Sequence, residues 1–114
     1  MGFSWQANVL QKDYFASKMK LEGEPMPLIS SFFGILIKMY FKDDDRHHTP
    51  HFHAKYGEYE ASIDFEGTIL AGDFPPNKLK LVVAWAEIHK DELKALWDLM
   101  QTSDEFFKIK GLDA

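Results

Sequence analysis

Cysteine is absent from this chain of 114 residues, which removes disulfide bridges and thiolate metal ligands from its chemistry. Long hydrophobic runs are absent as well. The longest nearly apolar stretch, residues 28–37, is interrupted by Ser30 and Ser31 and is too short to span a bilayer, which takes about 20 residues. Residues 1–10 show no basic start followed by an apolar segment, so no secretory signal is visible. These absences predict a cytoplasmic protein with no membrane association.

Basic residues are in the minority, with 13 Lys and Arg against 18 Asp and Glu, for a net charge of −5. An acidic surface repels phosphate backbones, so we expect no autonomous binding of nucleic acid. A local basic patch, or binding to DNA through a basic partner, stays open. The chain is 46% hydrophobic and 15% aromatic, which is enough for the core of one compact domain.

A break in the pattern falls at residues 22–27, where Gly23, Pro25 and Pro27 end any preceding helix. This break predicts two parts. Residues 1–25 form an N-terminal extension or docking arm, and residues 26–114 form a single α+β domain.

Alternation of period two predicts strands in the first part of this domain. The expected strands lie at residues 35–41, 51–56, 58–65 and 68–71. The clearest is 58–65, in which Tyr59, Ile63 and Phe65 are expected to face the core. Residues 106–110 alternate well enough for a short final strand.

A long helix is expected from Asn77, a good N-cap residue, to about residue 100. Apolar residues at three- and four-residue steps trace one face of this helix: Val82, Trp85, Ala86, Leu93, Leu96, Trp97 and Met100. The predicted fold is a small antiparallel β-meander of three or four strands packed by this one C-terminal helix, in two layers.

Histidine is concentrated in residues 46–55, which carry four of the five histidines and follow three consecutive aspartates at 43–45. His51 and His53 lie two apart on a predicted strand, so they project from the same face with side-chain origins about 7 Å apart. Their imidazoles can converge on one metal ion or one phosphate. Phe52 occupies the opposite, core-facing side, so both histidines are expected to lie outward. A solvated face that happens to be rich in histidine is the other interpretation.

Two imidazoles do not complete a zinc site, and the third ligand is open between His47, Asp45 and His89. Without cysteine, such a site would hold a divalent transition metal through nitrogen and oxygen ligands. His89 falls on the apolar face of the helix, either as a buried structural histidine or as an assisting group. Glu92, three residues on, shares its side of the helix, and two interpretations of a pair are open: it holds the tautomer of His89, or it is a helix-surface contact of little consequence. Arg46 and Lys55 are further binding candidates, because they bring positive charge near the histidines.

From residue 26 onward the chain resembles a family of small bacterial proteins known only as domain of unknown function family 4160. The resemblance lies in a Met-Pro start with an apolar strand at 26–35, Pro-His-Phe-His followed by Tyr-Gly at 50–57, Trp-Ala-Glu-x-His at 85–89, and Asp-Glu-Leu at 91–93. It implies that the candidate functional residues are His47, His51, His53 and His89.

The resemblance also implies a function, because genes of this family lie beside a gene for a second small protein. This arrangement is similar to that of toxin–antitoxin or host-defence pairs. We therefore expect one component of a two-protein module that acts by binding a small protein partner. An alternative is a metal- or histidine-dependent hydrolase, most plausibly a ribonuclease. Its catalytic candidates are His51, His53 and His89, with metal ligands at His47, His51 and His53. A second alternative is a regulatory binding protein that senses metal or pH.

Overall fold

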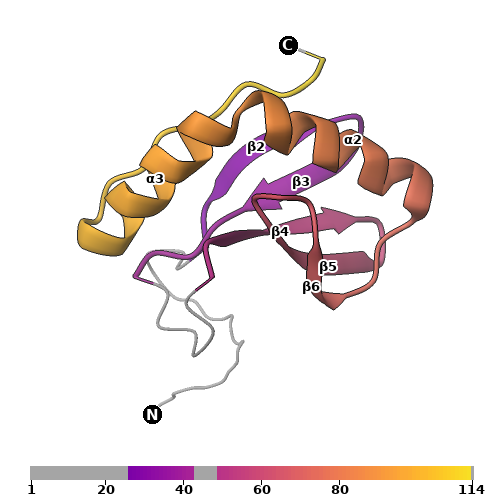
Figure 1. The fold of residues 1–114 in the computed structure, drawn as a ribbon, viewed down its shortest axis with the longest axis horizontal. Coiled ribbons are helices and arrows are strands. Elements are labelled where there is room, and N and C mark those ends of the chain that lie inside the picture. The colour runs from indigo at the N-terminus through magenta and orange to yellow at the C-terminus, as the bar shows by residue number, and fades with distance from the viewer. Residues whose placement is uncertain (1–25, 43–48, 114) are drawn as a thin grey trace.

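The computed structural model describes residues 26–42 and 49–113 (Figure 1). The fold is α+β, as predicted, and is built on one antiparallel sheet of five strands in the order β2-β3-β4-β5-β6. The strands are β2 (Leu28–Phe32), β3 (Ile35–Lys38), β4 (His51–Tyr56), β5 (Tyr59–Asp64) and β6 (Ile69–Gly72). Sequence neighbours pair throughout, which confirms the meander. The predicted N-terminal arm, residues 1–25, lies outside the described residues and stays a prediction.

The first hairpin was not predicted, because residues 28–37 form one nearly continuous apolar run in the sequence. The turn between β2 and β3 is formed by Phe33 and Gly34, with φ angles of 50° and 81°. Two successive positive φ angles match the right-handed twist of the flanking strands and favour glycine. Gly34 was therefore the signal for the extra strand, which raises the number above the three or four expected.

Two helices cover one face of the sheet (Figure 1), where one long helix was expected. They are α2 (Pro76–Ile88) and α3 (Lys90–Thr102), and His89 between them has the non-helical angles φ −109° and ψ 25°. The break lets both helices lay their apolar sides on a sheet that twists beneath them. Helix α2 begins after Pro75 rather than at Asn77, with a proline at its start that has no N–H to leave unpaired. In the described part of the chain, neither helix has the length and apolar character needed to cross a membrane.

The core lies between the sheet and the two helices, and Trp85 is at its centre. The Trp85 ring contacts those of Phe32 and Phe52, with centroids 5.4 and 5.5 Å apart. The predicted core face of β5 is confirmed for Ile63, which is fully buried, but wrong for Tyr59, which is 45% exposed. Tyr59 is the first residue of β5, beyond the area that the helices cover.

The final strand expected at residues 106–110 does not form, although the chain runs alongside β2 there. Ile109 N–H donates to the Ile29 carbonyl at 2.8 Å, and Trp85 Nε1 donates to the Lys110 carbonyl at 2.8 Å. Phe106 and Phe107 are both about two-fifths exposed instead of alternating. The segment thus covers the edge of β2 through isolated hydrogen bonds instead of a ladder.

Candidate functional site

The His51 and His53 rings lie together, as the spacing on one strand predicts, with centroids 5.2 Å apart. Phe52 between them is fully buried on the opposite side of β4. His51, however, is only 3% exposed, so the expectation that it faces solvent is wrong. The Trp97 ring of α3 packs 5.5 Å from the His51 ring and covers it.

A backbone carbonyl determines the tautomer of His51. Its Nδ1 lies 2.7 Å from the Thr49 carbonyl oxygen, which can only accept a hydrogen bond. Nδ1 therefore carries a hydrogen, and in the neutral ring the lone pair is on Nε2. This arrangement orients histidines in metal sites and in acid–base sites. Burial keeps His51 away from a large substrate, so it is better placed to position His53 than to react itself.

His53 opens onto the face of the sheet that the helices leave uncovered, which we call the open face. Its Nδ1 lies 3.3 Å from Ser62 Oγ on β5, and the Tyr40 ring stands edge-on at a centroid distance of 5.1 Å. These contacts hold the imidazole at the sheet surface.

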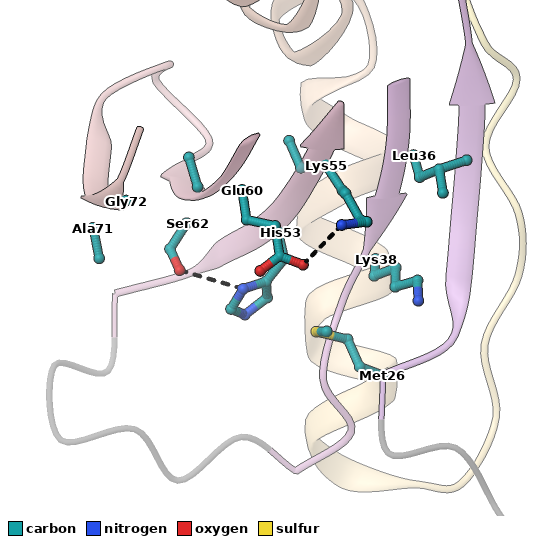
Figure 2. Close-up of a pocket in the computed structure, with 11 residues that line it drawn as sticks. Met26, Leu36, Lys38, His53, Lys55, Glu60, Ser62, Ala71 and Gly72 are labelled. Atoms are coloured by element: carbon teal, nitrogen blue, oxygen red, sulfur yellow. Dashed lines mark hydrogen bonds and ion pairs between the residues drawn. The ribbon is translucent and has the colours of Figure 1, made fainter. Parts of the chain in front are cut away.

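The open face is hollowed around His53, over a volume of about 220 Å³. Figure 2 looks onto this hollow with the helices behind the strands. Its polar and small lining residues include Lys38, His53, Lys55, Glu60, Ser62 and Ala71. Lys55, a predicted binding residue, therefore lies in the same hollow as His53.

Strand register explains why these side chains meet. Lys38 on β3 stands opposite His53, and His53 stands opposite Ser62 on β5. Side-chain origins of directly opposed residues lie about 5 Å apart, so the three form a row across the sheet. In the next row Lys55 Nζ lies 3.7 Å from Glu60 Oε2. Lys38 and Ser62 were not predicted as site residues, because the sequence does not show which residues stand opposite each other.

His89 belongs to a different place, the junction of α2 and α3. Its ring packs 5.8 Å from that of Trp85, on the helical side of the sheet. Its Nδ1 is hydrogen-bonded to Glu92 Oε1, which confirms the predicted pair. The sheet stands between His89 and the hollow, so the structure does not bring His89 to His53. The interpretation of His89 as a structural histidine fits these contacts.

The predicted metal site cannot be assembled from the described residues. Within residues 26–42 and 49–113, no three His, Asp or Glu side chains are grouped to hold a metal ion. His47, Asp45 and Arg46 lie outside the described residues. A site of His47, His51 and His53 therefore stays a prediction.

Comparison with known proteins gives one family. The model of the family described as "Domain of unknown function (DUF4160)" matches residues 34–98, from the first hairpin turn into α3. Neither the curated proteins nor the solved structures give a match to this chain.

Proposed function

The chain belongs to the DUF4160 family, and we propose that it acts by binding a small protein partner, as one component of a two-protein toxin–antitoxin-like or defence module. The observation that supports this proposal is the asymmetry of the sheet. The described helices pack on one face, and the open face presents a hollow of mixed polar and apolar lining.

The open face carries apolar residues among its polar ones, which favours the binding of another molecule over contact with water alone. An antiparallel sheet with one solvated face normally places polar residues there in strict alternation. Here Leu36 and Ala71 accompany His53 and Ser62 around the hollow. Apolar contact area with a few polar groups that fix orientation is typical of binding surfaces.

Co-expression with the protein encoded by the neighbouring gene tests this proposal. We expect the two proteins to co-elute in size-exclusion chromatography. Ala71→Trp, which fills the hollow, is expected to remove most of the complex, and Ala95→Trp on the exposed side of α3 is expected to leave it intact. Elution of the wild-type chain alone, or equal loss in both variants, would contradict the proposal.

A histidine-dependent hydrolase, here a ribonuclease, is the second candidate, and the closeness of the two imidazoles favours it. In this proposal His53 exchanges the proton at the hollow, and His51, held by the Thr49 carbonyl, positions it. The experiment is growth arrest and RNA cleavage on expression. Both are expected to vanish in His53→Ala and to persist in His89→Ala, on the other side of the sheet. Unchanged arrest in His53→Ala would end this candidate.

A further inference from the structure

The hollow carries positive charge on an acidic protein. The whole chain has a net charge of −5, whereas the described residues that line the hollow include two lysines, one glutamate and an imidazole. This local reversal of sign is a feature of the fold, because the charged residues come from β3, β4 and β5. Its ligand is therefore expected to be an anion.

Two donors flank the His53 ring in the row across the strands. Lys38 presents an ammonium and Ser62 a hydroxyl, and each stands directly opposite His53 in the register. His53 Nδ1 faces Ser62 Oγ and its Nε2 is buried, so the ring forms a wall of the hollow. Lys38 makes no ion pair with any residue that the structure describes. Its charge is thus not neutralised by a carboxylate of residues 26–42 or 49–113.

The second lysine is only weakly engaged. Lys55 and Glu60 are 3.7 Å apart, and their side chains are 46% and 71% exposed. Exposed pairs of this kind contribute little, so Lys55 can turn from Glu60 to a bound anion at small cost. Glu60 itself repels an anion, which makes it a useful position for a test.

The β6 side of the hollow is kept empty by small residues. Ala71 stands opposite Ser62 and Gly72 opposite Ala61. Gly72 has a φ of 89°, and a Cβ there would overlap the Glu60 carbonyl oxygen, so no larger residue fits. The space of about 220 Å³ holds a phosphate group together with part of the molecule that bears it.

We propose that this hollow binds the phosphate group of a small molecule. A phosphate monoester offers three acceptor oxygens and up to two negative charges, which match the two ammonium groups and the hydroxyl beside the His53 ring. A polynucleotide backbone fits the acidic chain as a whole less well. Phosphate binding goes beyond the proposed function and does not depend on it. Only one consequence, that the ligand regulates partner docking on the open face, rests on that function.

Titration of the chain alone with inorganic phosphate, followed by NMR at constant ionic strength, tests the inference. We expect the His53 ring and the amides of Ser62 and Ala71 to shift in a saturable manner. Loss of one charged hydrogen bond in Lys38→Gln or Lys55→Gln is expected to raise the Kd about three- to tenfold. Lys80→Gln, the same change on the exposed side of α2, is expected to leave the Kd unchanged, and Glu60→Gln to lower it.

A parallel titration with adenosine monophosphate asks what bears the phosphate. Tighter binding than inorganic phosphate supports a ligand that extends beyond the phosphate group, and equal binding supports recognition of that group alone. The inference is overturned if the shifts miss the hollow, do not saturate, or weaken as much in Lys80→Gln as in Lys38→Gln. Because no partner takes part, its failure is distinguishable from failure of the partner proposal.

Discussion

Three histidines of this chain show how burial decides what one residue type can do. His51 is covered by Trp97, His53 faces the hollow, and His89 lies between two helices, paired with Glu92. All three carry the same imidazole, a group that can exchange a proton or bind a metal ion. Of the three, only His53 combines a position on the open face with neighbouring charges, so it is the residue on which the hydrolase proposal depends most.

Truncating His51 is expected to destabilise the protein more than truncating His53. His51→Ala removes a buried ring and leaves a cavity beside Trp97, at a cost of about 2–3 kcal/mol. His53→Ala removes a half-buried ring at the surface and should cost about 1 kcal/mol or less. Urea unfolding of the two variants measures the difference. Equal costs would mean that Trp97 does not cover His51 in solution.

Gly57 and Gly72 both have a positive φ, so alanine substitutions at the two positions can be compared directly. A methyl group added at Gly57, which has a φ of 60°, would meet no atom within 4 Å, whereas one added at Gly72 would overlap the Glu60 carbonyl oxygen. Gly57→Ala should therefore cost only the backbone strain, about 1–2 kcal/mol. Gly72→Ala should cost clearly more in the same unfolding assay, since β6 must move away from β5. A smaller loss for Gly72→Ala would contradict the observed approach of these strands.

At the scale of elements, β5 has a core face that does not extend to its first residue. Ala61 and Ile63 are buried under the helices, while Tyr59 on the same side is 45% exposed. The hydrophobic alternation of a strand thus indicates which face points inward, but not how far the covering layer reaches. That reach depends on where α2 and α3 lie.

Aspartate substitutions at positions 63 and 59 test where the buried part of this face ends. Ile63→Asp buries an unpaired carboxylate, which costs several kcal/mol against a total stability of roughly 5–15 kcal/mol, so we expect unfolding. Tyr59→Asp, at an exposed position, should leave a folded protein, as should Ser62→Ala on the other face. Circular dichroism and soluble yield provide the measurement. A folded Ile63→Asp variant would show that β5 is assigned to the wrong face.

The start of α3 is tied to the β5–β6 turn by a lysine. Lys90 Nζ lies 3.0 Å from Glu66 Oε1 and 3.1 Å from Glu87 Oε1. These hydrogen bonds, with Glu66 first and then Glu87, raise the pKa of Lys90 above its ordinary value of 10.5. A raised pKa in the folded state means that the contribution of Lys90 to stability is fully present below pH 10.5 and is lost as the pH rises through the folded-state value.

Comparison with Lys90→Met should reveal this dependence. The difference in free energy of unfolding between wild type and variant is expected to be constant from about pH 7 to pH 10 and to shrink above that range. Lys80→Met, which removes an exposed lysine on α2, controls for the loss of charge. A Lys90 difference that grows with rising pH would reverse the assigned sign.

At the scale of the whole molecule, the sheet and the helices both contribute buried residues to the described core. Its buried residues run from Ile29 on β2 to Ile109 in the C-terminal segment, so the two ends of the domain meet at the β2 edge. Gly111 is packed against the Ser31 carbonyl oxygen and Phe32, which closes this edge further.

Deletion of residues 1–25 is therefore expected to leave a folded domain. The sheet, both helices and the C-terminal segment all belong to the remaining residues, so the free energy of unfolding should change by about 1 kcal/mol or less. Urea unfolding of the shortened chain, with thermal unfolding as a second measure, checks this. A loss of several kcal/mol would show that the deleted residues cover core surface.

Much of this protein could be predicted from the sequence because the relevant signals are local. Alternation predicted β4 and β5 and the proximity of His51 and His53, the strand and helix patterns together indicated an α+β fold, and short motifs identified the family that matches residues 34–98. The three-residue spacing of His89 and Glu92 predicted their pair. Each of these follows from residues a few positions apart on one strand, helix or turn.

Tertiary structure decided the rest, because it joins residues that are distant in the sequence. Trp97 buries His51, and the register of β3 and β5 brings Lys38 and Ser62 to His53. The helical layer is divided at His89 into two helices that pack on the sheet. Hydrophobic periodicity contains no information on which strand residues stand opposite or where a covering helix ends. The sequence by itself therefore determined strands β4 and β5 and the histidine pair, and packing determined that one member of the pair is buried and the other lines a basic hollow.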